Sequence, residues 1–179
     1  AIDGVTDDLI RISTMIEQKN KTDATKTLDS LIKKHKQFAD QAIKNSTIKK
    51  QLLEKMNTDV LELQELVRGL TLLKEVSTRS LDYLISFGER LSDDLVSFSL
   101  QELKKKSIAL NGKEVGIVTD SNFGESRPLM DTTRIRISKT LGSLLSKKII
   151  PVVGGFAGAD QHGNITTFGR GGSDYTATI

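Results

Sequence analysis

A glycine-rich run at residues 166–176, with the sequence TTFGRGGSDYT, restricts the fold of this chain more than any other stretch. Its glycines let the backbone approach a ligand closely and adopt positive φ without strain. Ser173 and Asp174 are typical of a helix start, where free N–H groups and the helix dipole attract an anion. Arg170 can hold a carboxylate or phosphate through two parallel hydrogen bonds. The run therefore predicts a loop that binds an anion and leads into a helix.

The composition is that of a globular protein, with 37% hydrophobic and 27% charged residues. Aromatic residues make up only 4%, so we expect a core built mainly from Leu, Ile and Val. The 26 basic and 23 acidic side chains are too evenly balanced to indicate binding to nucleic acid or to a membrane. The absence of cysteine excludes disulfides, thiolate metal sites and cysteine nucleophiles.

The sequence has no apolar run near the roughly 18 residues that a membrane span needs, and it has no visible signal peptide. We therefore expect a soluble, cytoplasmic protein. Because the sequence lacks an initiator Met and ends inside a predicted helix, we also expect it to be a fragment of a longer chain.

Apolar residues that recur every three or four positions predict four amphipathic helices, at residues 4–18, 22–44, 46–74 and 78–106. Thr6 and Ser46 are the expected N-caps of the first and the third helix. Phe38 and His35 fall on the apolar stripe of the second helix, so we interpret His35 as a packed core residue rather than a ligand. Residues 14–76 are assigned a structural role.

Gly88 lies inside the fourth predicted helix, where a glycine costs roughly 1 kcal/mol relative to alanine. A helix break, a close backbone approach or a ligand would each account for it. Glu89 follows directly. It is either a surface carboxylate or a carboxylate turned inward to hold an ammonium group.

Short strands and turns replace the helical pattern after residue 106. Asn111 and Gly112 predict a tight hairpin turn between strands at residues 107–110 and 114–119.

Further along, residues 136–146 predict a short helix, and residues 148–156 a strand. The apolar centre of that strand is typical of a strand covered on both faces. Residues 160–164, which include His162, predict a polar hairpin tip. These elements together indicate an α/β architecture, in which ligands bind at the carboxyl ends of the strands.

Several mechanisms are excluded by their motifs. The sequence has no P-loop pattern, and residues 169–172 do not form the glycine pattern of dinucleotide-binding proteins. His35 and His162 lack the spacing of zinc ligands, and Ser173 has no base close in sequence. What remains is an anion site with an arginine, hydroxyl groups and one acidic residue, suited to a carboxylate or a phosphate.

The run at residues 166–176 closely resembles the signature of the aspartokinases, the aspartate kinases of the amino acid kinase family. Other segments resemble the family in the same order and spacing, at residues 4–7 (GVTD), 86–92 (SFGERLS), 118–124 (VTDSNFG) and 151–156 (PVVGGF). The resemblance is weak over residues 14–76 and strong from about residue 78 onward. It implies a three-layer α/β/α sandwich with a large helical segment in the N-terminal part, and an amino-acid-binding part that spans residues 1–179.

The resemblance also implies a reaction, the transfer of the γ-phosphoryl group of MgATP to the side-chain carboxylate of L-aspartate. This reaction gives 4-phospho-L-aspartate, in the first step of lysine, threonine and methionine biosynthesis. Aspartate must be held by its backbone groups so that its side-chain carboxylate points in line at the phosphorus.

Residue roles follow from the same resemblance. Arg170 would clamp the α-carboxylate, and Glu89 would hold the α-ammonium group. Asp174 would orient the charge-stabilising lysine or the metal-bound phosphate region, rather than act as a base, because a carboxylate nucleophile has no proton to remove. The remaining pocket residues would be Thr6, Phe156, Thr167, Gly171, Gly172 and Ser173.

ATP and Mg²⁺ are the implied cofactors, and a homo-oligomer is the implied state of the full-length enzyme. The family opens with a strand and a Lys-Phe-Gly-Gly-Thr segment, and the sequence begins just after that region. It also stops before the nucleotide-binding part and the regulatory ACT domains of the family, so we expect the fragment to be inactive alone. Phe168 and Gly154 stand where the family pattern more often has Leu and Thr. The alternatives are another amino acid kinase, acting on glutamate or a nucleotide, and a non-catalytic module that retains an amino acid pocket.

Overall fold

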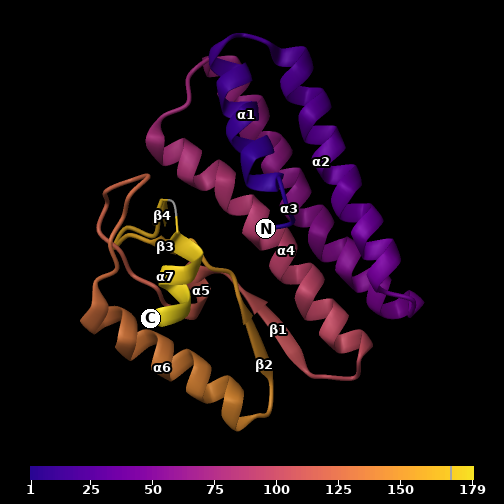
Figure 1. Cartoon of the computed structure of the whole chain (residues 1–179), viewed down its shortest axis with the longest axis vertical. Coiled ribbons are helices and arrows are strands. Elements are labelled where there is room, and N and C mark those ends of the chain that lie inside the picture. The colour runs from indigo at the N-terminus through magenta and orange to yellow at the C-terminus, as the bar shows by residue number, and fades with distance from the viewer. Residues whose placement is uncertain (170) are drawn as a thin grey trace.

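Four long helices form the first part of the chain in the computed structural model, which describes residues 1–169 and 171–179. They pack side by side, and α4 lies between the other three and the rest of the molecule (Figure 1). Their bounds are α1 Val5–Glu17, α2 Lys21–Ala42, α3 Ser46–Leu73 and α4 Thr78–Glu102. The four helices predicted from apolar periodicity are confirmed, with small differences at their ends.

Two predicted helix caps are wrong. Thr6 lies inside the first turn of α1, whose N-cap is Gly4 at a φ of 76° with no side-chain cap. Glycine reaches this left-handed conformation without strain, so no hydroxyl is needed to turn the chain there. Ser46 is the first helical residue of α3. The N-cap is Asn45, whose side chain accepts hydrogen bonds from two backbone N–H groups of the first turn.

Aliphatic side chains fill the core of the four helices, as the low aromatic content predicts. Burying each such side chain contributes about 1.5–3 kcal/mol, so these contacts dominate the stability of this part of the chain. The largest fully buried side chains there include Leu9, Ile12, Leu52, Leu63, Leu84, Phe87 and Leu91.

His35 is a core residue, as predicted. Its side chain is fully buried, and Nδ1 donates a hydrogen bond of 2.9 Å to the carbonyl oxygen of Leu31. Burial lowers the pKa of His35, which keeps the imidazole neutral. Phe38 differs from the prediction, since 43% of it is exposed. It lies beside the buried line of Leu31, His35 and Ala39, which follow one another at intervals of four residues.

Gly88 is the point where α1 and α4 approach closely. Helix α4 continues through it without a break, and a Cβ at this position would lie 3.3 Å from side-chain atoms of both Ala1 and Val5. Of the three explanations considered for this glycine, the close backbone approach is therefore confirmed and the helix break is wrong. The contact brings the start of α1 next to Glu89.

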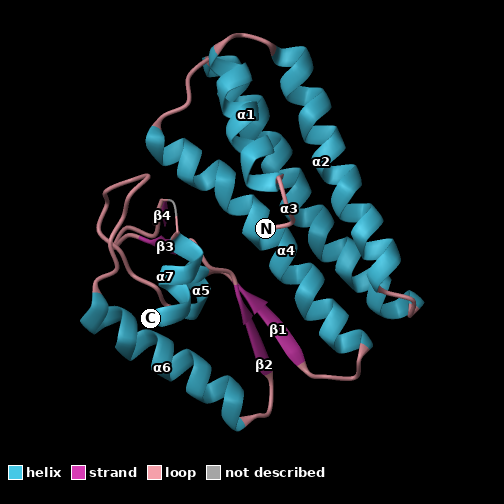
Figure 2. Cartoon of the chain, in the orientation of Figure 1, coloured by secondary structure: helices cyan, strands magenta, loops and turns pink. Residues whose placement is uncertain are grey.

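Two small sheets and three further helices make up the described residues of the second part of the chain. Strand β1 pairs with β2 in parallel, and β3 pairs with β4 antiparallel. Figure 2 shows β1 and β2 lying between α4 and α6, so helices flank this sheet on both sides. The predicted α/β class, with a large helical segment in the N-terminal part, is confirmed. The bounds are β1 Ser107–Leu110, α5 Gly112–Val115, α6 Met130–Ser146, β2 Ile150–Val153, β3 Ala157–Ala159, β4 Ile165–Thr167 and α7 Gly172–Thr178.

The predicted hairpin at Asn111 and Gly112 is wrong, because these residues start helix α5. The Asn111 side chain accepts from the backbone N–H of Glu114, and the Glu114 carboxylate accepts from the N–H of Asn111. A Cβ on Gly112 would lie 1.8 Å from the carbonyl oxygen of Ala157. The glycine therefore serves the close packing of α5 on β3, not a turn.

Two further boundaries differ from the prediction. Helix α6 begins six residues earlier than position 136, at Met130. Strand β2 is not covered on both faces, since 41% of Ile150 is exposed and its other residues are partly exposed. The sheet that holds β2 has only two strands within the described residues, which leaves part of its surface open.

The predicted hairpin tip at residues 160–164 is confirmed, between β3 and β4. The carboxylate of Asp160 accepts hydrogen bonds from the backbone N–H groups of His162 and Asn164 and from the hydroxyl of Ser121. Burial acts in the opposite direction, but these bonds and one from the Asn164 side chain lower the pKa of Asp160 to about 2. The ionised carboxylate organises the turn.

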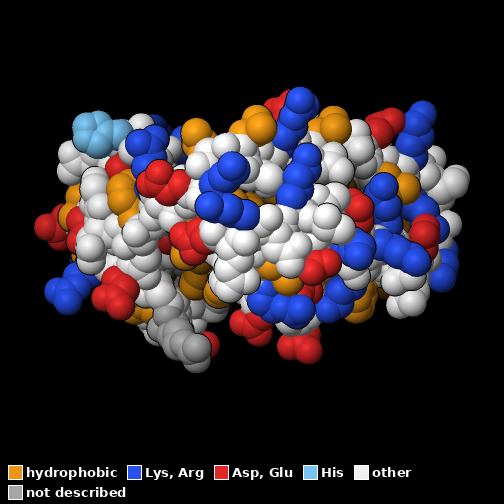
Figure 3. All heavy atoms as spheres, turned by 90° about the horizontal axis from the view of Figure 1, so that it is seen from above, with side chains coloured by type: hydrophobic (Ala, Val, Ile, Leu, Met, Phe, Trp, Pro, Cys, Tyr) orange, Lys and Arg blue, Asp and Glu red, His pale blue; other side chains and the backbone are white. Residues whose placement is uncertain are grey.

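Basic and acidic side chains interleave over the face shown in Figure 3. Ion pairs such as Arg11 with Asp8, at 3.1 Å, and Lys50 with Glu54, at 3.9 Å, have at least one strongly exposed partner. Such pairs contribute about 0–1 kcal/mol each. Within the described residues, no helix combines the length and the hydropathy that crossing a membrane requires.

Candidate functional site

A cavity of about 930 Å³ opens between the middle of α4 and the turns of the second part of the chain. This volume lies in the range typical of small-molecule sites, about 300–1,000 Å³. Helix α5 and the turn between β2 and β3 line its other sides. The charged and hydroxyl-bearing residues that α4 contributes are Arg79, Ser80, Tyr83, Ser86, Glu89, Arg90 and Asp93.

Glu89 lines this cavity and is partly buried, with 18% of its side chain exposed. Its Oε2 accepts a hydrogen bond of 2.6 Å from the α-amino group of Ala1. Of the two alternatives that the sequence left open, the structure has the carboxylate directed inward. Its role toward a substrate remains a prediction.

The glycine-rich run joins β4 to α7, as the sequence predicts. Gly169 and Gly171 have φ values of 73° and 76°, which glycine adopts freely. The N-cap of α7 is Gly171, without a side-chain cap, so Ser173 and Asp174 lie exposed in the first turn and do not cap the helix. Arg170 lies outside the described residues.

The start of α7 packs directly behind the turn that lines the cavity. A Cβ on Gly155 would lie 3.0 Å from Cα of Ser173. A Cβ on Gly172 would lie 3.2 Å from the ring of Phe156 and 2.9 Å from Cβ of Phe168. The glycines of both segments are therefore required for this contact, which makes α7 and the turn one continuous wall.

Phe156, which is part of this wall, has an unusual backbone conformation, with a φ of 74°. Its N–H donates to Oγ1 of Thr176, and its carbonyl oxygen accepts from the N–H of Phe168. The backbone on both sides of the glycine-rich run is thus tied to residue 156.

Thr167 faces a buried carboxylate rather than the cavity. Its hydroxyl donates to Oδ1 of Asp82 at 2.6 Å, and its N–H donates to Oδ2 at 2.9 Å. The N–H of Gly124 also donates to Oδ2, at 2.9 Å. Burial raises the pKa of Asp82, although these hydrogen bonds act in the opposite direction. The hydrogen bonds to Asp82 therefore hold β4 and the loop around residue 124 against α4.

The predicted site residues thus fall into distinct places. Among the described ones, Glu89 lines the cavity, while Phe156, Gly172 and Ser173 form the wall behind it. Thr6 lies on the first turn of α1, next to Val5, which contacts Gly88. Thr167 faces Asp82, whereas Gly171 and Asp174 are exposed at the start of α7.

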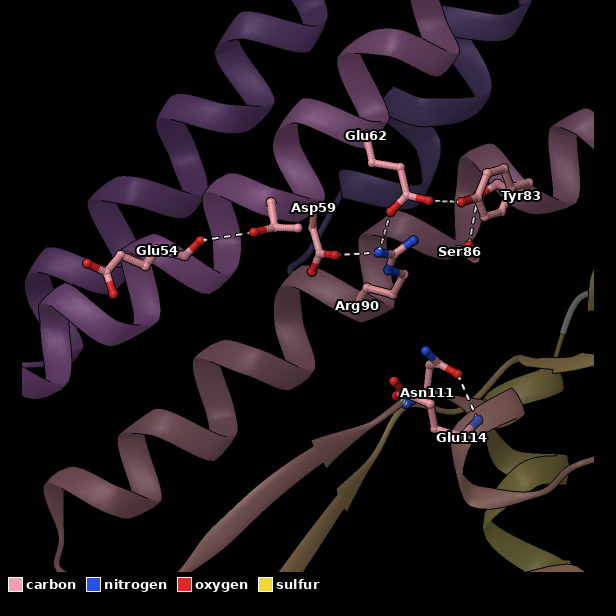
Figure 4. A network of polar contacts seen from close by, with 9 residues as sticks. Glu54, Asp59, Glu62, Tyr83, Ser86, Arg90, Asn111 and Glu114 are labelled. Atoms are coloured by element: carbon pink, nitrogen blue, oxygen red, sulfur yellow. Dashed lines mark hydrogen bonds and ion pairs between the residues drawn. The ribbon is translucent and has the colours of Figure 1, made fainter.

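Arg90 belongs to a polar network that the sequence analysis did not identify (Figure 4). Its Nη2 donates to the carboxylates of Asp59 and Glu62 on α3, and the hydroxyl of Tyr83 also donates to Glu62. Its guanidinium lies 4.3 Å from the ring centroid of Phe87. Burial alone would lower the pKa of Arg90, but its two acidic partners raise it above its ordinary value. The charge of Arg90 is thus already paired within the protein.

Asp82 and Asp93 were missed as well, although the sequence holds a signal for them. Asp82, Ser86, Glu89 and Asp93 follow one another at intervals of three or four residues, so they share one face of α4. A polar line of this kind on an otherwise buried helix indicates a site.

Residues 1–169 and 171–179 contain no group of three or more His, Cys, Asp or Glu side chains that could hold a metal ion.

Comparison with known proteins gives one family. The model described as "Amino acid kinase family" matches residues 3–179. Aspartokinase 3, chloroplastic, of Arabidopsis thaliana is 38% identical over 117 residues, which are 65% of this chain and 21% of that protein. The aspartokinase of Geobacillus stearothermophilus is 43% identical over 102 residues, 56% of this chain and 24% of that protein. The matched part is thus about a quarter or less of these relatives.

The fold also resembles solved structures. Aspartokinase III of E. coli in complex with aspartate and ADP aligns with a TM-score of 0.86 at 24% identity, covering 99% of this chain and 37% of that one. The same enzyme in complex with lysine and aspartate gives a TM-score of 0.85 at 23% identity. At this level of identity, the likeness is one of fold.

Proposed function

The chain belongs to the amino acid kinase family, and on that premise we propose that it forms the aspartate-binding part of an aspartate kinase. The proposed reaction transfers the γ-phosphoryl group of ATP to the side-chain carboxylate of L-aspartate. One observation carries the proposal: two segments that resemble the aspartokinases, at residues 86–92 and 151–156, line one cavity, and two more pack against them. Glu89 and Gly155 line it, Ser173 packs behind Gly155, and the start of α1 contacts Gly88.

Glu89 is the proposed partner of the substrate's α-ammonium group. An ionised carboxylate at a partly buried position makes a charge-assisted hydrogen bond, which is about twice as strong as a neutral one. Arg170 is the proposed clamp for the α-carboxylate, since a guanidinium binds both carboxylate oxygens at once. With both backbone groups of aspartate held, its side-chain carboxylate is left free as the nucleophile.

The remaining residues have supporting roles in this proposal. Thr6, Phe156, Gly171, Gly172 and Ser173 shape the aspartate pocket, Thr167 supports it through its hydrogen bonds to Asp82, and Asp174 orients the phosphate region. ATP supplies the transferred group, and Mg²⁺ is the expected metal of the nucleotide. The homo-oligomeric state and the cytoplasmic location expected from the resemblance belong to the same proposal.

Acyl phosphate formation by the full-length protein that contains this chain, trapped with hydroxylamine, tests this function. We expect ATP-dependent product from aspartate and a loss of at least about a hundredfold in kcat/KM for Arg170→Ala and Glu89→Gln, because each removes a charged substrate contact. Glu17→Gln, at an exposed end of α1, is the matched control and should retain activity. Full activity in both site variants would refute the site.

A substrate panel separates this proposal from its nearest alternative. Product from glutamate or from a nucleotide, with none from aspartate, would make the protein another amino acid kinase. Binding of aspartate without any phosphoryl transfer would make it a non-catalytic module.

A further inference from the structure

Asp93 is a buried carboxyl group that faces the same cavity as Glu89. It stands one helical turn further along α4, and both residues line the cavity. Only 8% of Asp93 is exposed, and its Oδ2 has no hydrogen-bond partner. A buried polar group is normally paired, so an unpaired carboxyl beside a cavity indicates a missing partner.

Gly154 provides the space that this carboxyl group occupies. A Cβ on Gly154 would lie 2.1 Å from Oδ2 of Asp93, so any larger residue would collide with it. Glycine at 154 and a carboxyl at 93 therefore fit each other, and they place a second acidic group at the turn beneath Phe156.

The charged groups around Asp93 explain its protonation state. Glu89 and Asp94 on α4 and Glu114 on α5 face it with negative charge, while the α-amino group of Ala1 acts in the opposite direction. Burial first, and then the charge of Glu89, raise the pKa of Asp93 to about 8. At about pH 7 the carboxyl group of Asp93 is thus protonated, beside Glu89.

We propose that Asp93 is a second substrate-binding carboxylate, and that Asp93 and Glu89 together hold the ammonium group of the amino acid. This inference rests on the proposed function and extends it to a residue outside the motif. An ammonium group fits better than a metal ion, because two carboxylates converge here and the described residues offer no group of three or more metal ligands. An ammonium group has three donors and can serve both carboxylates at once.

A proton balance follows from this arrangement. The incoming ammonium group favours the charged form of Asp93, which therefore releases its proton to solvent as the amino acid binds. No bond to carbon forms or breaks in this step. Affinity for the amino acid should rise with pH until Asp93 is ionised in the free protein, near its pKa of about 8.

Calorimetry of the full chain with L-aspartate tests the proton release without any substitution. Titrations at about pH 7, in two buffers with different heats of ionisation, should give close to one proton released per aspartate bound. The release should fall toward zero at about pH 9, where Asp93 is already ionised.

Asp93→Asn is the decisive variant, because asparagine keeps the shape of the protonated acid and removes its charge. It should abolish proton release, flatten the pH profile of binding and weaken aspartate binding about tenfold. Asp94→Asn is the matched control, since Asp94 is a neighbouring buried acid that does not line the cavity. It should keep the wild-type affinity within about twofold, and thermal unfolding should show that both variants are folded.

The possible outcomes distinguish a failure of this inference from a failure of the proposed function. If the wild type binds aspartate but Asp93→Asn binds it equally well with the same proton release, Asp93 is not a substrate ligand, while the proposed function stands. If the wild type does not bind aspartate, both fall. Binding of Mg²⁺ alone that is lost in Asp93→Asn would assign the carboxylate pair to a metal and overturn the ammonium site.

Discussion

Thr167 donates both its hydroxyl and its backbone N–H to the carboxylate of Asp82, which lies 85 positions earlier in the sequence. The N–H of Gly124 donates to the same carboxylate. These bonds connect three segments that the sequence keeps apart, and they hold the strand that leads into the glycine-rich run against α4.

Replacement of Asp82 should loosen that strand. Asp82→Ala leaves two backbone N–H groups and one hydroxyl without their acceptor, so we expect the free energy of unfolding to fall by about 3 kcal/mol. Urea unfolding followed by circular dichroism measures the change. Asp29→Ala, on an exposed face of α2, is the control and should stay within about 0.5 kcal/mol of the wild type. Equal stabilities of the two variants would contradict this view of Asp82.

Two of the helical glycines, Gly88 and Gly69, should respond in opposite ways. A side chain at Gly88 meets Ala1 and Val5, so Gly88→Val should separate α1 from α4 and cost about 2 kcal/mol. A Cβ on Gly69, in α3, meets nothing within 4 Å, so Gly69→Ala should raise stability by about 0.5–1 kcal/mol. Thermal unfolding of the pair checks both signs. Tolerance of valine at position 88 would show that the helices have room to separate.

Removal of Arg90 should be far more damaging than removal of an exposed arginine. Arg90→Ala leaves Asp59, whose side chain is 3% exposed, as a buried charge without its partner, and we expect a loss of about 3 kcal/mol. Arg11→Ala, in which the arginine side chain is 63% exposed, should cost less than about 1 kcal/mol. Chemical denaturation of both variants decides between a structural network and a surface pair.

Asp93 should make stability depend on pH in a defined window. Its pKa is raised to about 8 in the folded protein, so the fold keeps a proton that the unfolded chain has already released. The free energy of unfolding therefore decreases as pH rises toward that value. Asp94 contributes in the same direction only up to its own raised pKa of about 6.

Between about pH 6 and pH 8, Asp93→Asn should thus gain stability over the wild type, by up to about 2 kcal/mol. Melting temperatures of the two proteins across this range measure the difference, in which the contributions of other groups, His35 included, cancel. Parallel profiles would show that Asp93 is ionised in the fold.

The long helices could be predicted because their apolar periodicity is repeated over many turns, which averages out single exceptions such as Phe38. The prediction of a hairpin at Asn111 was wrong for the opposite reason, because it relied on a very short pattern. Asn followed by Gly starts a tight turn or caps a helix, and the choice depends on Glu114 and on the contact of Gly112 with Ala157. That contact joins residues 45 positions apart, so no local pattern reports it.

The candidate site divides in a similar way. Glu89 and the glycine-rich run could be identified because their neighbours in sequence form recognisable segments. Asp82, Arg90 and Asp93 could not, since their significance comes from partners on other elements: Thr167, Asp59 and Gly154. What the sequence does carry is the common face of Asp82 and Asp93 on α4, a pattern that periodicity reveals but residue type alone does not.

Helix α4 is an unbroken rod from Thr78 to Glu102, with α1, α2 and α3 packed along one side and the cavity on the other. The helix carries four side chains at fixed spacings from one another: Asp82, Glu89, Arg90 and Asp93. Sliding it by one residue's rise, about 1.5 Å, would move all four together relative to the glycine-rich wall. The three supporting helices therefore set the distance between these side chains and the glycine-rich wall. Substitutions deep in the core of those helices, far from any substrate, would change substrate affinity.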